Sequence, residues 1–407
     1  MATAIETLRG KHWRLAEIAA VGLVALTLSA AMVRLLTPTQ DAPTDFFQDY
    51  SSARNLLLGK PVYVTMQQAR YDYLGQRTSQ RTPNNGHPPA SVLLVIPFAW
   101  TDYARAGILW NWATLVALAA SITILRSKLK QDPSIWQWML LLVAFTVWPP
   151  LWFHVTQEQF GLVFLLLITI AWSAGREGQD GRAGCLIGVA GAIKFFPVVL
   201  LVYFAFRRRW RAVILGLSSF VLVNLVALLV LGVGTYKDYL ALAPYLSIFS
   251  TLPQNVSLTG FFSRLFSPSL SWLLILIGST AILLTIWRQA SRKPADFDSE
   301  FALTLTGALL LFPLTWQHSF VMLLLPLAIC VTRFADARAN SRYLLLASWL
   351  LMAVPEPLLP GFSGHALPST ARSLGVLSVN FYGLLACFIA QTQFSAAPRT
   401  KVAESVW

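Results

Sequence analysis

Long apolar runs separated by short polar turns make up most of the chain, and the polar residues cluster in a few places between them. An apolar run of about 20 residues is typical of a transmembrane helix, whereas a membrane β-barrel shows short alternating segments. We therefore predict an all-α polytopic membrane protein with about twelve transmembrane helices in one domain over residues 1–407. The full-length runs that we expect to cross the membrane are residues 15–36, 104–125, 134–152, 160–174, 212–232, 270–287, 299–314, 319–332, 343–359 and 373–391.

The first run, residues 15–36, follows a basic segment, and this arrangement also occurs in secretory signal peptides. Ser29, Ala30 and Ala31 would permit cleavage, but a signal peptide has a shorter apolar core. We expect the run to remain as the first span.

Segment 88–100 does not fit a full crossing, because basic clusters are expected on the cytoplasmic side. The lysine and arginine residues at 126–130 follow the run 104–125 and belong inside, so the adjacent segment 88–100 cannot also cross. We expect it to be re-entrant or interfacial. Non-helical backbone at that depth survives only when it is buried in protein or lines a wet cavity.

Residues 183–206 lie between two basic clusters, at 176–182 and 207–211, which both belong inside. A single crossing would leave one of these clusters outside. The segment is therefore predicted to be a hairpin of two short helices with residues 194–197 at its tip, and the tip should face an outer cavity.

The composition of the chain supports a membrane protein. Hydrophobic residues make up 56% of the chain and charged residues 12%, whereas a soluble domain has about 25% charged residues. The net charge of +13 comes from clusters between apolar runs, which fits the positive-inside rule and gives no reason to expect a nucleic-acid partner. This sidedness places residues 1–14 and 392–407 in the cytoplasm and makes 37–88 and 233–269 the two larger extracytoplasmic loops.

Motifs for soluble cofactor chemistry are absent from the sequence. There is no Walker loop, no dinucleotide-binding fingerprint and no zinc-type spacing, and Cys185, Cys330 and Cys387 stand singly in apolar runs. We expect neither a metal, nor a cofactor, nor a disulfide framework. A transferase working at the outer face would need an activated donor that is carried by a lipid.

Residues 41–89 form the longest polar stretch and contain Asp41, Asp45, Asp49 and Asp72. Asp45 and Asp49 are four residues apart in a segment whose apolar positions have helical spacing. Their carboxylates should share one face of a short amphipathic helix at the outer membrane surface. Acidic residues in a first helical turn also complement the helix dipole, so a purely structural role fits the same pattern.

Lys194, at the predicted hairpin tip, is the only basic residue between Arg182 and Arg207. A lysine at membrane depth is costly unless it lines an aqueous cavity or has an anionic partner. A phosphate is a natural partner for this compact charge. An ion pair with Glu158 is the structural alternative.

Several other polar side chains fall on the predicted outer side, and each has a plain structural alternative. His87 fits a surface imidazole and His318 an interfacial one, while Asn255 matches a glycosylation acceptor only weakly. Arg264 is a second outer cation, and Gln159 lies at the outer turn between two spans.

The order of these polar motifs resembles glycosyltransferase family 87, the polyprenyl-phosphate-mannose-dependent mannosyltransferase-like proteins of the GT-C superfamily. The resemblance covers about residues 40–330, and each motif is weak alone. It rests on an aspartate after the first span, Leu-Leu-x-Gly-x-Pro-x-Tyr at 56–63, Pro88-Pro89, Gln159, Gly-x5-Lys-x2-Pro at 188–197, Asn-x-Ser-Leu at 255–258 and Pro-x-x-Trp-x-His at 313–318.

The resemblance implies an inverting GT-C enzyme whose large first outer loop carries amphipathic helices. Asp45 aligns with the family's general base, and Asp49, where the family more often has an aromatic residue, is its rival. The donor would be a polyprenyl-phosphate hexose, such as mannose, and the acceptor a lipid or glycan outside a bacterial inner membrane. The expected donor-binding residues are Lys194, His318, His87, Arg264 and Gln159, and those expected to line the site or bind the acceptor are Tyr50, Tyr63, Asn255 and Trp316.

The outer turn departs from the family pattern. Residues 158–161 read Glu-Gln-Phe-Gly, where the family usually reads Gly-Gln-x-Asn. This departure points to a different sugar or acceptor.

Two other functions remain open at this point. A transporter or lipid-linked-glycan flippase would tolerate the same lysine at membrane depth, but it should show repeat symmetry, and no strong internal repeat is visible. A family member without catalytic activity, acting as an assembly subunit, is the other alternative.

Overall fold

A computed structural model describes residues 43–79, 82–83, 85–129, 135–355 and 370–394, with isolated positions between 19 and 30. The predicted N-terminal segment (1–14) and nearly all of the first span (15–36) and of the C-terminal tail lie outside the described residues. In the described part the backbone is helical, apart from loops and one isolated bridge between Thr65 and Pro83. The predicted all-α class is confirmed.

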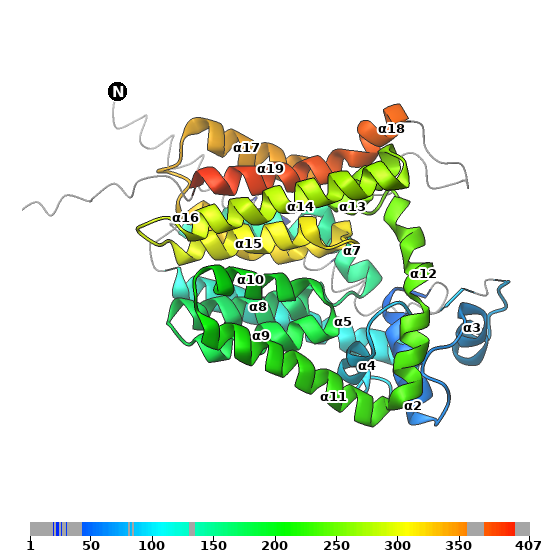
Figure 1. The fold of residues 1–407 in the computed structure, drawn as a ribbon. Coiled ribbons are helices and arrows are strands. Elements are labelled where there is room, and N and C mark those ends of the chain that lie inside the picture. The colour runs from blue at the N-terminus through cyan, green and yellow to red at the C-terminus, as the bar shows by residue number, and fades with distance from the viewer. Residues whose placement is uncertain are drawn as a thin grey trace, which may run out of the picture.

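The helices occur in the following order along the chain (Figure 1): α2 (Phe46–Leu57), α3 (Met66–Leu74), α4 (Pro89–Val95), α5 (Tyr103–Lys128), α6 (Ile135–Thr146), α7 (Pro149–Gln157), α8 (Gly161–Arg176), α9 (Asp180–Ile193), η1 (Phe196–Val198), α10 (Val199–Phe206), α11 (Trp210–Ala241), α12 (Ala243–Leu246), η2 (Ser247–Thr251), α13 (Leu258–Leu265), α14 (Pro268–Ala290), α15 (Phe297–Leu311), η3 (Gln317–Leu323), α16 (Leu324–Thr332), α17 (Ala339–Met352), α18 (Thr370–Leu374), η5 (Val376–Ser378) and α19 (Val379–Phe394).

Among the described residues, four helical segments are long and apolar enough to cross a membrane: α5, α11, α14 and the joined segment Val376–Phe394. The pair α7 and α8 makes a fifth if it is counted as one broken span, with a bend of 114°. Large apolar side chains on α11 and α14 are exposed, which suits a lipid-facing surface. The predicted number of about twelve membrane crossings remains a prediction.

One predicted span is broken in the structure, and the segment predicted not to cross contains only a short helix. The run 134–152 is broken between α6 and α7, because Pro149 lacks an N–H and fits the first position of a new helix. In segment 88–100 only α4 is helical, and its 7 residues rise by about 10 Å, far less than a bilayer core of about 30 Å. This helix cannot cross alone, as expected.

The predicted hairpin is present. Helix α9 begins at Asp180, and the chain turns back at Lys194 through η1 and α10. The guanidinium of Arg209 forms an ion pair with Asp180 and donates to the carbonyl of Gly175 at 2.6 Å. The 14 residues of α9 rise by about 21 Å, so Lys194 lies well away from this closed base.

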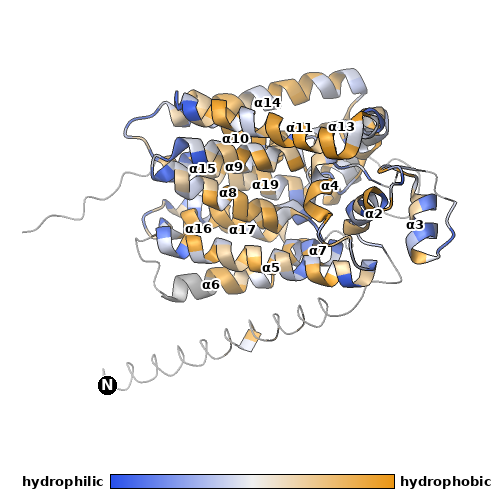
Figure 2. Cartoon of the chain, turned by 90° about the horizontal axis from the view of Figure 1, so that it is seen from below, coloured by the Kyte–Doolittle hydropathy of each residue, from blue (hydrophilic) through white to orange (hydrophobic). Residues whose placement is uncertain are grey.

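Ion pairs tie together the end of the bundle that contains the base of this hairpin. They link Lys128 with Glu177, Arg176 with Asp298, Arg207 with Glu300, Arg209 with Asp180, and Arg333 with Asp296. Helices α2, α3, α4 and α12 lie at the other end (Figure 1). The hydropathy colouring shows apolar residues along the bundle helices and hydrophilic residues at their ends and on α3 (Figure 2).

Small residues allow α9 and α11 to approach at backbone distance. A Cβ atom added at Gly184 would lie 2.0 Å from the carbonyl oxygen of Ala212, and one added at Gly188 would lie 2.0 Å from that of Gly216. Both pairs repeat after four residues, the spacing of the small-residue contacts that let membrane helices pack closely. The position of Lys194 depends on this contact because the lysine directly follows α9.

We predict that Gly188→Ala separates α9 from α11 and destabilises the fold, because backbone atoms cannot move aside for the added methyl group. Overpacking of this kind costs about 1–3 kcal/mol or more. The control is Gly234→Ala, since no atom lies within 4 Å of a Cβ at that position. Thermal unfolding of the purified protein in detergent should show a lower midpoint for Gly188→Ala only. Equal midpoints for the two variants would contradict the packing argument.

Candidate active site

Helix α2 carries the candidate base and is fixed on α5 by aromatic contacts. The ring of Phe46 stacks on Trp110 at 5.2 Å between centroids, and Phe47 meets Tyr103 edge to face at 5.1 Å. The hydroxyl of Tyr50 donates to the carbonyl of Thr101 at 2.9 Å. These buried contacts set the position of the first turn of α2.

Asp45 lies at the start of α2, and its carboxylate makes no capping bond to its own helix. Instead the side-chain amide of Gln159 donates to Oδ2 of Asp45. The residue is exposed, but protein atoms surround it on most sides, and this desolvation raises the pKa of the Asp45 carboxyl. His87, the hydrogen bond from Gln159, and Lys194 all act in the opposite direction and lower that pKa. The main contact of the Asp45 side chain is therefore the hydrogen bond from Gln159, and not a bond to the N-terminus of its own helix.

The turn that presents Gln159 is held through Glu158. The backbone of Glu158 has a left-handed conformation with φ of 54°, and its carbonyl accepts from Nε1 of Trp110 at 2.8 Å. Its carboxylate accepts from the hydroxyl of Thr44 at 2.8 Å and from Nδ2 of Asn111 at 3.3 Å. The alternative of an ion pair between Glu158 and Lys194 does not occur.

A small cavity, with room for roughly one water molecule, lies beside this turn. Lys194 reaches it from the hairpin tip, and His318 reaches it from η3. Neither side chain has a hydrogen bond or an ion pair with another residue of the described part. The cavity lining consists of Gln159, Phe160, Gly161, Phe164, Lys194, Phe196, His318, Ser319 and Met322.

Asp49, the second carboxylate of α2, has a different environment. It is fully buried, and Nδ1 of His87 lies 2.8 Å from its Oδ2. Its Oδ1 accepts from the hydroxyl of Ser91 at 3.0 Å and from Nδ2 of Asn85 at 3.4 Å. The two candidate bases therefore differ in their environments: Asp45 is accessible, whereas Asp49 is buried among its hydrogen-bond partners.

Comparison with known proteins identifies the family of the chain. The model of glycosyltransferase family 87 matches residues 86–359. The chain belongs to glycosyltransferase family 87. It is a membrane glycosyltransferase, and the sequence resemblance noted above is confirmed. The matched range begins after α2, so the assignment of Asp45 rests on its geometry and on the motif order.

This family 87 chain is similar to two mycobacterial proteins that have closely related names. A polyprenol-phosphate-mannose-dependent alpha-(1-2)-phosphatidylinositol mannoside mannosyltransferase of Mycobacterium tuberculosis is 26% identical over 296 residues, 67% of this chain and 68% of the relative. A polyprenol-phosphate-mannose-dependent alpha-(1-2)-phosphatidylinositol pentamannoside mannosyltransferase of the same species is 25% identical over 295 residues, 70% of this chain and 67% of the relative. Neither the family nor these relatives supports the transporter alternative.

Two of the predicted donor-binding or site-lining residues in this family 87 protein hold a loop. Arg264 donates from Nη1 to the carbonyls of Leu252 and Asn255 at 2.9 and 2.8 Å. The amide of Asn255 donates to the carbonyl of Pro313 at 2.7 Å and accepts from the hydroxyl of Ser257 at 2.8 Å. These bonds join the start of α13 to the segment that precedes His318. Arg264 and Asn255 therefore support the position of His318 through the backbone.

The remaining aromatic candidates also have structural partners. The hydroxyl of Tyr63 donates to the carbonyl of His87 at 2.7 Å, and its ring lies 6.1 Å from that of Tyr239. Trp316 meets Phe249 edge to face at 6.2 Å between ring centroids. Tyr63 therefore fixes the backbone of a candidate site residue, and Trp316 covers the loop beside η3.

Sequence reasoning missed the partners that connect these residues. Ser91 and Asn85 bind Asp49, and Thr44 binds Glu158. Asn85 and Gly86 form an Asn-Gly pair, which is typical of a turn, but nothing in the local pattern indicates the contact of Asn85 with α2. Serine and threonine give no local signal because either can bond its own helix.

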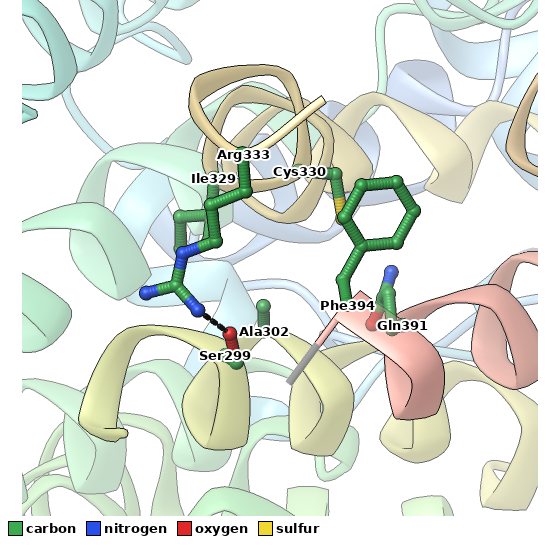
Figure 3. A pocket seen from close by; sticks show the side chains of 7 residues that line it. All are labelled: Ser299, Ala302, Ile329, Cys330, Arg333, Gln391 and Phe394. Carbon is green, nitrogen blue, oxygen red and sulfur yellow. Dashed lines mark hydrogen bonds between the residues drawn. The ribbon is translucent and has the colours of Figure 1, made fainter. Parts of the chain in front are cut away.

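A second cavity lies at the other end of the same helices and is lined by Ser299, Ala302, Ile329, Cys330, Arg333, Gln391 and Phe394. Arg333 points toward Ser299 in this cavity (Figure 3). The same guanidinium binds both carboxylate oxygens of Asp296. Because its cation already has a carboxylate partner, this cavity is a weaker candidate for an anionic substrate than the cavity at Lys194.

We predict that Arg264→Met lowers the thermal stability of the protein, because it leaves the carbonyl of Asn255 without its donor and removes one of the two donors to the carbonyl of Leu252. Each unsatisfied buried acceptor costs about 1–3 kcal/mol. Limited proteolysis should also cleave the segment 247–257 faster. The matched control is Arg292→Met, since Arg292 is exposed and has no such contacts. An unchanged melting midpoint for Arg264→Met would show that the loop does not depend on this residue.

Proposed function

We propose that this protein transfers a hexose, with mannose as the first candidate, from a polyprenyl-phosphate donor to a glycolipid or glycan acceptor. The observation that carries the proposal is the meeting of an accessible carboxylate, Asp45, with a cavity lined by Lys194 and His318 at one end of the bundle. The donor class comes from the relatives, whose names describe dependence on polyprenol-phosphate-mannose.

In the proposed reaction Asp45 is the general base. An acceptor hydroxyl attacks the anomeric carbon, the new carbon–oxygen bond forms, and the bond from that carbon to the phosphate oxygen breaks. The proton of the hydroxyl passes to the Asp45 carboxylate, and polyprenyl phosphate leaves. Attack from the face opposite the leaving group inverts the configuration at the anomeric carbon.

The leaving group explains the need for cations at the site. A phosphodiester carries one negative charge, and the released phosphate monoester carries up to two at neutral pH. Stabilisation of this developing charge is strongest in a site shielded from water. Lys194, which has no carboxylate within ion-pair distance in the described part, supplies a positive charge, and His87 and His318 lie close enough to interact with Asp45 or Lys194. We assign the donor phosphate to these three side chains.

Gln159 orients the base in this proposal. Its amide donates to one oxygen of Asp45, which leaves the other oxygen for the acceptor hydroxyl. The contacts of Glu158 hold the side-chain amide of Gln159 next to Asp45. We place this end of the bundle outside a bacterial inner membrane, because the ion-paired end contains the basic clusters expected in the cytoplasm.

Asp45→Asn is expected to reduce transfer by about a hundredfold or more, because the amide cannot accept the proton. The assay would use membranes containing the full chain, a panel of radiolabelled polyprenyl-phosphate sugars and a membrane glycolipid extract as acceptor. Asp72→Asn, on the far side of the outer loop in an ion pair with Lys60, is the matched control and should transfer normally. Normal turnover by Asp45→Asn together with an inactive Asp49→Asn would move the base to Asp49.

Gln159→Leu is expected to shift the acid limb of the pH profile upward. The base must be ionised, and burial already raises the pKa of Asp45, so activity should fall at a higher pH than for an exposed aspartate. The hydrogen bond from Gln159 lowers that pKa, and its removal should raise it further. The acid limb of kcat/KM would be measured beside the exposed control Gln67→Leu. A limb that stays in place or moves to lower pH would contradict the role of Gln159.

A further inference from the structure

The contact between Asp49 and His87 suggests a role for Asp49 other than that of general base. Oδ2 of Asp49 is 2.8 Å from Nδ1 of His87, and Oδ1 accepts from Ser91 and Asn85. An ionised carboxylate only accepts hydrogen bonds, so with Asp49 as a carboxylate Nδ1 of His87 is the donor at this contact. The other ring nitrogen, Nε2, is not in contact with Asp49 and lies on the opposite side of the imidazole.

The backbone and the ring of His87 are both fixed. Its N–H donates to Oδ1 of Asn85 at 2.8 Å, and its carbonyl accepts from the hydroxyl of Tyr63 at 2.7 Å. The ring meets Phe160, one of the cavity-lining residues, edge to face at 5.4 Å. Two contacts of the ring, with Asp49 and with Phe160, together with the two backbone bonds limit the directions in which Nε2 can point, and 15% of the side chain remains exposed.

Charged and titratable groups approach His87 from several elements. Asp49 is on α2, Asp45 is its N-cap, and His318 is on η3; Lys194, at the hairpin tip, interacts with both aspartates and with His318. Asp49 is the group in direct contact with the ring. Its other oxygen is occupied by Ser91 and Asn85, and the residue is fully buried, so an acceptor hydroxyl has no free oxygen to reach.

We propose that Asp49 is a positioning residue that holds His87 with Nε2 directed at the phosphate of the lipid-linked donor. This inference rests on the proposed function. When His87 carries a second proton, Nε2 donates to the phosphate while the buried carboxylate balances the charge of the ring. The pair adds a donor to the charge of Lys194 as the sugar–phosphate bond breaks. It also accounts for an aspartate at a position where the resemblance to the family led us to expect an aromatic residue.

Asp49→Asn tests this arrangement because it changes one atom. Ser91 and Asn85 both donate to the position of Oδ1, so the amide oxygen should stay there and the amide nitrogen should face His87. That nitrogen donates, so Nδ1 of His87 would become the acceptor. The imidazole would lose both its counter-charge and its original tautomer, while the shape of the site would be kept.

The decisive measurement is a double-mutant cycle with Asp49→Asn and His87→Gln in membranes containing the full chain. Radiolabelled polyprenyl-phosphate mannose is the probe, and both transfer rate and donor KM are measured. We expect each single variant to lose roughly tenfold to a hundredfold in kcat/KM, as for a charge-assisted hydrogen bond. The double variant should be no worse than His87→Gln alone, because Asp49 acts through His87.

Further variants separate positioning from folding. Ser91→Ala removes one bond to Asp49 and should lower transfer several-fold, but not in the His87→Gln background. His87→Gln should keep more activity than His87→Ala, because the glutamine amide can still donate near the position of Nε2. Asp72→Asn is the control for the loss of one carboxylate charge and should leave the rate unchanged.

Two results would overturn the inference: normal transfer by Asp49→Asn, or multiplied losses in the double variant. An active Asp45→Asn variant in the same assay would instead reject the assignment of Asp45 as the base. If that variant is active while Asp49 and His87 remain coupled, only the base assignment falls. The two proposals are therefore tested separately.

Discussion

The turn at Glu158 is the contact on which the site depends. Glu158 joins its own turn to two other parts of the chain: its carboxylate binds Thr44 beside α2, and α5 binds it twice, through Asn111 to the carboxylate and through Trp110 to the carbonyl. The sharp bend of 114° between α7 and α8 occurs at the same place. Without it Gln159 would not reach Asp45. Space for the carboxylate is provided by Gly107, where a Cβ would come within 3.0 Å of Oε1 of Glu158.

The bundle separates two kinds of polar chemistry at its two ends. At one end several buried or half-buried basic residues are paired with carboxylates, as in the pairs of Arg333 with Asp296 and Arg209 with Asp180. At the other end Lys194 has no such partner in the described part of the chain. Burying an unpaired charge is expensive, and a protein retains one where a ligand of opposite charge completes the site. The contrast between the two ends therefore supports an anionic substrate at Lys194 without reference to any relative.

Charge counting and motif order predicted part of this arrangement. The hairpin at 183–206 followed from the basic clusters on either side of it, and the ion pair between Asp180 and Arg209 confirms that its two ends meet. The break at Pro149 and the contacts of Glu158 could not be predicted, because apolar periodicity does not distinguish a straight span from a bent one. Asp49 and His87 are 38 residues apart, and no local pattern pairs residues at that separation.

The two aspartates of α2 show why chemical identity alone does not assign a base. They are one helical turn apart, and spacing made them equal candidates. Asp49 has hydrogen-bond partners on both oxygens and no exposed surface, so a substrate hydroxyl cannot reach its carboxylate. Asp45 has one donor and an exposed edge, and its raised pKa brings its proton affinity closer to that required of a base near neutral pH. A base needs a free oxygen, and a positioning residue needs both oxygens occupied, so the same helix can supply one of each.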